Sequence, residues 1–163
     1  MIRIRTILVP TDFGDSAKCA WEYAQVLAQQ FNSRVHLVHV LTPPAIAADP
    51  LGARQLGMGV AELLRECEED CRKALDKIPV PRQLERRVVR KLLNGPPVAQ
   101  ILDYVDANDI DLVVMGTHGR GPVQHVLLGS VAELVVRHCP VPVLTVHTTG
   151  RVLRDRLRTP RRK

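Results

Sequence analysis

Residues 116–131 have the composition of an anion-binding loop. Gly116 and Gly119 directly follow an apolar run, and Gly129-Ser130 precede an amphipathic stretch. Glycines leave backbone N–H groups open to a ligand, and a helix start favours negative charge. The segment also contains two side chains that could add positive charge, His118 and Arg120. These features favour a phosphate site, although glycines that only form turns would give the same pattern.

The common nucleotide-binding motifs are missing from this loop. No Gly-Lys-Ser/Thr sequence ends it, so it is not a Walker A loop. A dinucleotide-binding fingerprint built on Gly119 and Gly121 would need a small residue at position 124, where the chain has Gln124. The residues alone therefore indicate an anion and leave its identity open.

A carboxylate, Asp12, follows the first apolar run directly. It is a candidate for a binding pocket, and the alternative is a capping role in the turn at 12–16. No acid–base partner lies next to it, which argues against a catalytic base. His36 and His39 lie on opposite faces of the second apolar run, and we expect both to be satisfied within a sheet.

Metal and disulfide chemistry is not indicated. The four cysteines, at positions 19, 67, 71 and 139, are expected to be reduced thiols, since Cys67 and Cys71 are spaced for neighbouring turns of a helix. No cluster of carboxylates suggests a dedicated metal site.

The elements that must position these residues alternate regularly. Apolar runs predict strands, and 3.6-residue periodicity predicts helices. The expected strands cover 5–9, 35–40, 84–92, 111–115 and 142–146, and the expected helices cover 16–31, 60–78, 98–105 and 130–138. Asp15 or Ser16 is expected to cap the first helix. Residues 41–59 form the longest connection, interpreted as mobile, with a lid as the alternative.

This alternation predicts an α/β fold with a doubly wound parallel sheet and helices on both faces. Ligands of such sheets bind beyond the carboxyl ends of the strands, where the winding direction reverses. Asp12 and Gly116 both follow strands. We therefore expect them at the same edge of the sheet.

Length and composition fit one soluble domain of 163 residues. Aromatic residues make up only 3%, so the core must be aliphatic, and no apolar run reaches the ~18 residues of a membrane helix. A membrane protein, a secreted disulfide scaffold and a disordered chain are disfavoured. With no secretory signal, we expect a cytoplasmic location.

The net charge of +6 lies entirely in the last thirteen residues. Residues 151–163 hold seven basic residues and one acidic residue, which leaves 16 of each sign, from totals of 23 and 17, in 1–150. We expect 1–150 to be the domain and 151–163 to be a flexible basic tail, with a short docking helix as the alternative. Nucleic acid is not an expected partner beyond nonspecific contacts of the tail.

Four blocks of the sequence share their order and spacing with a known family. They are Ile7-Leu8-Val9-Pro10-Thr11-Asp12 with Ser16 and Ala20, Asp111 to Gly119, Gly129-Ser130-Val131-Ala132-Glu133, and Cys139-Pro140-Val141-Pro142-Val143-Leu144. Together they contain Gly116-x2-Gly119-x9-Gly129-Ser130. This pattern resembles the ATP-binding branch of the universal stress protein family, and the resemblance covers about residues 3–147.

The resemblance implies a five-stranded parallel sheet of order 3-2-1-4-5, of the adenine-nucleotide alpha-hydrolase-like type. It also implies homodimers formed through the last strand and an adenine nucleotide, ATP or else AMP or ADP, between the first and fourth strands. Mg²⁺ would be held mainly by the phosphates and water.

The family's binding positions carry over residue by residue. Those beside the nucleoside are Pro10, Thr11 and Asp12, and Val40 is where the backbone meets the adenine. Those at the ribose and phosphates are Gly116, Gly119, Gly129, Ser130 and Val131. His118 and Arg120 lie inside the motif without a role fixed by it.

The leading hypothesis is an ATP-binding universal stress protein that acts as a nucleotide-responsive regulatory or protective module. Hydrolysis would be slow or absent, since no general base or arginine finger can be named. The first alternative is an adaptor that uses its dimer surface and basic tail, with nucleotide incidental. The second is a nucleotide-processing enzyme, which the absence of His-x-Gly-His and Ser-Gly-Gly loops disfavours.

Overall fold

Short aliphatic runs form the strands of this protein, and longer amphipathic segments form its helices. The computed structural model describes residues 3–42, 59–117 and 129–147. The elements are β1 (Thr6–Pro10), α1 (Asp15–Phe31), β2 (Arg34–Leu41), α3 (Val60–Asp76), the 3₁₀ helix η2 (Arg82–Arg87), β3 (Val88–Asn94), α4 (Pro97–Ala107), β4 (Leu112–Gly116), α5 (Ser130–His138) and β5 (Val143–Val146). The expectations for 43–58, for His118, Gly119 and Arg120, and for the tail 151–163 lie outside the described residues.

The five strands form one parallel sheet in the order β3-β2-β1-β4-β5. The chain winds from β1 outward through β2 to β3, then crosses to β4 on the other side of β1 and continues to β5. The predicted fold class and strand order are therefore confirmed. The winding direction reverses between β1 and β4, which is where such sheets bind ligands.

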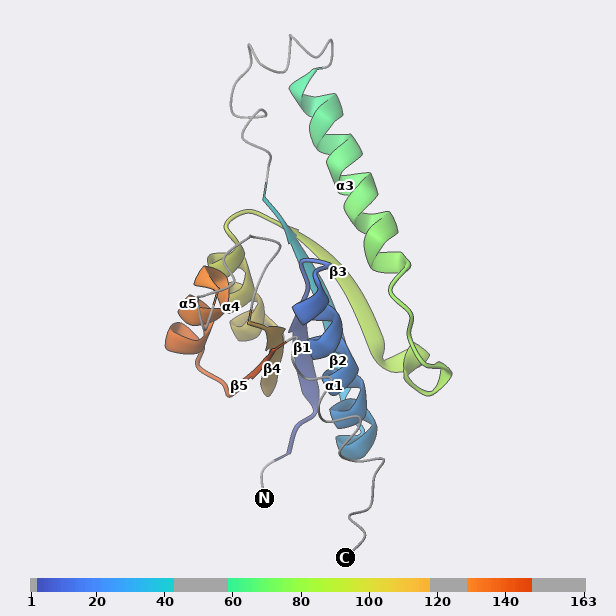
Figure 1. Cartoon of the computed structure of the whole chain (residues 1–163), viewed down its shortest axis with the longest axis vertical. Helices are drawn as coiled ribbons and strands as arrows, with labels where there is room; N and C mark the ends of the chain where they lie inside the picture. Colours follow the sequence, from blue (N-terminus) through green and yellow to red (C-terminus); the bar gives the residue numbers. More distant parts are fainter. Residues whose placement is uncertain (1–2, 43–58, 118–128, 148–163) are drawn as a thin grey trace, which may run out of the picture.

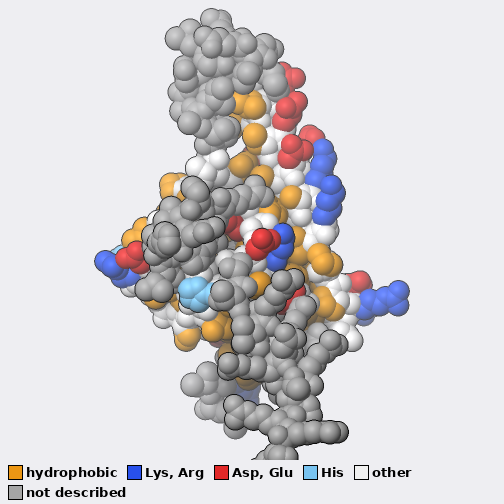
Figure 2. Space-filling view, in the orientation of Figure 1, with side chains coloured by type: hydrophobic (Ala, Val, Ile, Leu, Met, Phe, Trp, Pro, Cys, Tyr) orange, Lys and Arg blue, Asp and Glu red, His pale blue; other side chains and the backbone are white. Residues whose placement is uncertain are grey.

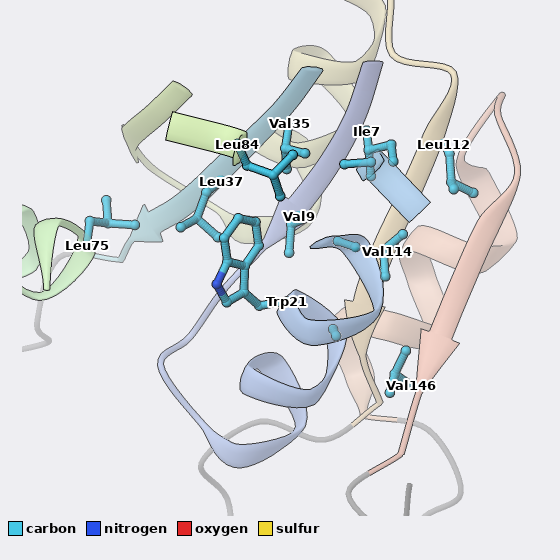
Figure 3. Packing of buried hydrophobic residues seen from close by; sticks show 13 residues of the cluster. Ile7, Val9, Trp21, Val35, Leu37, Leu75, Leu84, Leu112, Val114 and Val146 are labelled. Atoms are coloured by element: carbon cyan, nitrogen blue, oxygen red, sulfur yellow. The ribbon is translucent and has the colours of Figure 1, made fainter. Parts of the chain in front are cut away.

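Alternate residues of the strands face two separate cores. Ile7 and Val9 of β1 face the layer of α1, α3 and η2, whereas Leu8 faces the layer of α4 and α5. These helix layers cover the two faces of the sheet (Figure 1). Figure 3 shows the first core, where Trp21 of α1 packs near Val9 and Leu37. Both cores are mainly aliphatic, as the low aromatic content predicts.

The start of the third strand differs from the prediction. Residues 84–87, predicted as the first part of the strand over 84–92, belong to the 3₁₀ helix η2, and β3 begins at Val88. Leu84 is fully buried in the first core, so its apolar character reflects burial in a 3₁₀ turn and not a strand. β3 lies at the edge of the sheet, next to β2.

Helix α3 packs against the sheet mainly by its C-terminal end, where Leu75 is buried. Its N-terminal part extends past the carboxyl ends of the strands (Figure 1). Arg90 of β3 donates to the carbonyls of Leu75 and Ile78 at 2.9 and 2.7 Å, satisfying acceptors at the end of this helix. Figure 2 shows acidic and basic side chains along the outer side of α3.

The N-terminus of α1 is not capped as expected. The N-cap is Gly14, which has no side-chain cap, and both Asp15 and Ser16 lie inside the helix. Asp15 instead pairs with Lys18 at 2.8 Å. The turn before the helix satisfies its backbone through side chains of the preceding residues, so a cap by Asp15 or Ser16 is not required.

No helix in the described ranges has the length and apolar character needed to cross a bilayer.

Candidate functional site

A cavity of about 210 Å³ opens at the carboxyl edge of the sheet, where β1 and β4 end. Eight of the residues predicted for the site line it: Pro10, Thr11, Asp12, Val40, Gly116, Gly129, Ser130 and Val131. They come from the ends of β1, β2 and β4 and from the start of α5. Segments far apart in the sequence thus meet at the point where the winding reverses.

Sequence reasoning missed other residues around this cavity. His39 and Val38 of β2, Pro97 and Ile101 of α4, and Thr117 also line it, together with Ala17, Met115 and Ala132. Most are apolar residues whose pattern indicated only a core. His39 and Thr117, polar residues beside Val40 and Gly116, could have been identified by that position, whereas the apolar members have the pattern of core residues.

Only one oxygen of the Asp12 carboxylate has a hydrogen-bond partner in the described structure. Its Oδ1 accepts the N–H of Gly14 at 2.9 Å, which closes a turn ahead of α1. Its Oδ2 is buried and has no hydrogen-bond partner. The turn interpretation is thus seen at Oδ1, while the binding interpretation stays a prediction that concerns Oδ2. A buried acceptor without a partner is costly, so it indicates a missing donor.

The two sheet histidines have partners, as predicted. His39 Nδ1 lies 2.7 Å from the carbonyl oxygen of Thr11, and its ring contacts Phe13. His36 Nδ1 lies 3.0 Å from the hydroxyl of Tyr104 in the α4 layer. Burial, with the nearby charges of Arg34 and Lys91, lowers the pKa of His36, so its neutral form is favoured.

The start of α5 faces the cavity. Its N-cap is Gly129, which offers no side-chain cap to the N–H groups of the first turn. The N–H of Gly129 donates to the carbonyl oxygen of Thr117, which fixes the position of this glycine. Thr117 is fully buried and binds β5 through its N–H, 3.0 Å from the Val146 carbonyl. The end of β4 thus fixes both β5 and the start of α5.

Gly116 has a packing role that the sequence did not indicate. A Cβ added there would lie 2.7 Å from the backbone carbon and Cβ of Ser16 and 2.8 Å from the nitrogen of Ala17. The glycine allows the first turn of α1 to approach the end of β4. It therefore shapes the cavity wall by close packing, in addition to any contact with an anion.

No group of three or more His, Cys, Asp or Glu in the described part of the chain is arranged to hold a metal ion. Asp12 is the one carboxylate among the cavity residues named above.

A second opening lies at the amino ends of the strands. It is larger, about 860 Å³, and its lining is Arg3, Arg5, Thr6, Phe31, Asn32, Arg34, Asp109 and Asp111. The Asp111 carboxylate there accepts the backbone N–H groups of Arg5 and Thr6, at 2.6 and 2.9 Å. We place the candidate site at the smaller cavity, because ligands of doubly wound sheets bind at the carboxyl edge.

Comparison with known proteins identifies a family and a shared fold. The model of the "Universal stress protein family" matches residues 3–147. A universal stress protein of Thermus aquaticus is 34% identical over 142 residues, which are 87% of this chain and 98% of that protein.

Two solved structures share the fold. The structure of protein MJ0577 of Methanocaldococcus jannaschii superposes with a TM-score of 0.68 at 26% identity, and covers 90% of this chain and 97% of that chain. A universal stress protein in complex with cAMP superposes with a TM-score of 0.55 at 26% identity, covering 88% of this chain and 97% of that chain. The second protein thus holds an adenine nucleotide on a similar fold.

Proposed function

This chain belongs to the universal stress protein family, and we propose that it binds ATP in the cavity between β1 and β4. The observation that carries this proposal is the buried Oδ2 of Asp12, which has no hydrogen-bond partner and lies at the point where the winding reverses. The cAMP complex of a similar protein supports an adenine nucleotide as the class of ligand.

The nucleoside would occupy the cavity itself. Its volume of about 210 Å³ is below the ~300–1,000 Å³ of whole-ligand pockets, which suits part of a nucleotide. The cavity has apolar walls from Val38, Val40 and Ile101, and Asp12 Oδ2 would accept a hydrogen bond from a ligand N–H or O–H group. An apolar cavity with one acceptor that lacks a partner fits a base and ribose better than it fits an isolated anion.

The phosphates would lie at the start of α5. The first turn of this helix lacks a side-chain cap, so its N–H groups and dipole are suited to negative charge. Ser130 and Val131 line the cavity there, and Gly129 adds no side chain. His118, Gly119 and Arg120 are proposed to contribute from the preceding loop. Any Mg²⁺ would be held through the phosphates and water.

Hydrolysis of ATP is proposed to be slow or absent. Asp12 is the one carboxylate among the described cavity residues. The other polar groups there are backbone groups, hydroxyls and the His39 imidazole. A carboxylate that accepts from the nucleotide and from Gly14 is poorly placed to activate water. The protein is thus proposed to respond to nucleotide as a cytoplasmic regulatory or protective module in stress.

The assembly is proposed to be a homodimer formed through β5. This strand is at the edge of the sheet, and Leu144 on it is exposed. Leu134 and Val136 of the neighbouring α5 are exposed too. Pairing of two such edges would complete the backbone hydrogen bonds of β5 and cover apolar surface.

Release of bound ligand tests the proposal without prior choice of nucleotide. The protein is purified with no nucleotide added, denatured, and the supernatant analysed by mass spectrometry. We expect ATP or another adenine nucleotide from the wild type, and much less from Asp12→Asn prepared in parallel. Recovery of equal amounts from both proteins would reject the cavity as the site.

A further inference from the structure

We propose that His39 is the positioning residue of this site: its ring fixes the Thr11–Gly14 loop, and through it the orientation of the Asp12 carboxylate. This inference rests on the proposed function, because it concerns how the same cavity is prepared for its ligand. His39 comes from β2, whereas the loop follows β1. The contact therefore joins two neighbouring strand ends at the cavity, which both His39 and Asp12 line.

The first part of the argument is a directed hydrogen bond. His39 Nδ1 lies 2.7 Å from the carbonyl oxygen of Thr11. A carbonyl only accepts, so Nδ1 must carry the proton, and the neutral ring is fixed in its Nδ1–H form. On the other side, the N–H of Thr11 donates to Val38 at 2.8 Å. The N–H and the carbonyl of Thr11 are thus both hydrogen-bonded to β2, the N–H to Val38 and the carbonyl to His39.

The second part is a ring contact that supports an unfavourable backbone. The rings of His39 and Phe13 have centroids 4.4 Å apart and planes at 39°. Phe13 has a φ of 65°, in the left-handed region that bulky side chains rarely adopt. Such a conformation persists only where its surroundings hold it. The His39 ring is one of the groups that hold it.

The third part concerns what this backbone does for Asp12. With Phe13 in the left-handed region, the N–H of Gly14 turns back to donate to Asp12 Oδ1 at 2.9 Å. The N–H of Phe13 donates likewise to Thr11 Oγ1 at 3.0 Å. These two bonds close the loop and leave Asp12 Oδ2 buried without a partner. His39 therefore acts on the ligand through Asp12, and sets the direction of the acceptor.

Two substitutions separate the donor from the ring. In His39→Asn the amide can still donate to the Thr11 carbonyl, as Nδ1 does. His39→Phe keeps an aromatic ring beside Phe13 and removes the donor. We expect His39→Phe to weaken ATP binding about 10-fold in calorimetry, and His39→Asn to retain affinity within about 3-fold of wild type. Equal losses in both variants would contradict positioning by the hydrogen bond.

A double-mutant cycle tests whether His39 acts through Asp12. In an Asp12→Ala background, His39→Phe should cost no further affinity, because the group it positions is gone. Additive losses would overturn the inference. The matched control is His36→Phe, on the same strand but bonded to Tyr104 on the opposite face. It should leave the affinity for ATP unchanged.

A readout that needs no nucleotide keeps this inference separate from the proposed function. Amide hydrogen exchange of Phe13 and Gly14 reports the two bonds that close the loop. Exchange at both should accelerate at least 10-fold in His39→Phe, and stay within 2-fold of wild type in His36→Phe. Failure of ATP to bind the wild type would reject the proposed function alone. Unchanged exchange in His39→Phe would reject the role of His39.

Discussion

Asp12 shows how the two oxygens of one carboxylate can have different surroundings. Its Oδ1 accepts from Gly14, and its Oδ2 is buried without a partner. The sequence predicts that this carboxylate follows a strand, but it does not predict which oxygen forms the turn and which lacks a partner. That division depends on the left-handed backbone at Phe13, for which the residue types give no signal.

Asp12→Asn tests the unpaired oxygen directly. The amide oxygen of Asn can still accept from Gly14, while the amide nitrogen replaces the acceptor at Oδ2. We expect the affinity for ATP in calorimetry to fall about 10-fold or more, since hydrogen bonds to charged groups contribute about 1.5–3 kcal/mol. The control is Asp15→Asn, which removes an exposed pair with Lys18. Wild-type affinity in Asp12→Asn would contradict the role given to Oδ2.

Gly116→Ala tests the close approach of α1 to β4. The added Cβ would lie 2.7 Å from atoms of Ser16, so the helix or the strand must shift. We expect the free energy of unfolding in urea to fall by about 1–3 kcal/mol, the usual cost of overpacking. Gly59→Ala is the control, because nothing lies within 4 Å of its added Cβ. A Gly116→Ala protein as stable as the control would show that the contact is readily relieved.

At the scale of the elements, periodicity predicted the five strands and four of the helices, usually within two residues of their observed ends. It failed where an apolar residue is buried by a turn. Leu84 suggested a strand, yet it lies in η2 and packs on the first core. A single buried position does not distinguish a 3₁₀ turn from a strand, because periodicity needs several residues.

The arginines of β3 and η2 show a second limit. Charged side chains on an edge strand usually oppose pairing with another chain. Arg90 instead donates to carbonyls at the end of α3, and Arg87 donates to Asn32 at 2.6 Å, near the end of α1. These contacts join elements distant in the chain. Residue types alone could not identify them, since a charged side chain on a strand has the same pattern in either role.

The contact between α4 and β2 should make stability depend on pH. Burial lowers the pKa of His36, so the unfolded chain takes up this proton at a higher pH than the folded chain. The folded state therefore loses stability as pH falls through about 6.5 and on toward the lowered pKa. We expect this contribution to be smaller than about 1.4 kcal/mol per pH unit, because the side chain is only half-buried.

Urea unfolding at several pH values between 7.5 and 5 checks this expectation. The decline in unfolding free energy should be shallower in His36→Asn than in the wild type. His138→Gln, an exposed position in the last turn of α5, is the comparison. If wild type and His36→Asn show the same slope, the titration of His36 does not contribute.

At the scale of the whole molecule, the alternation of elements predicted the parallel sheet, and the family resemblance supplied its strand order. Both are confirmed. The resemblance also selected residues from four elements that the structure places around one cavity. The apolar members of the lining, such as Ile101 and Met115, could not be told from core residues, because they also pack in the second core.

The assembly can be tested through the exposed edge of the sheet. Leu144→Arg places a charge on β5, where Leu144 is 38% exposed. We expect the wild type to be a dimer by light scattering and this variant to be a monomer. Val26→Arg, at a 66% exposed position on α1, should remain a dimer. A monomeric wild type would contradict the proposed dimer. Dimers in both variants would place the interface away from β5.

A calorimetric titration of the purified protein with ATP tests the central claim most directly. A Gly129→Leu variant is titrated alongside the wild type. Gly129 has a φ of −66°, which any residue adopts, so the variant should fold with a side chain at the start of α5. We predict one ATP per wild-type chain and no detectable binding to the variant. Equal affinity in both proteins, or no binding to the wild type, would contradict the account.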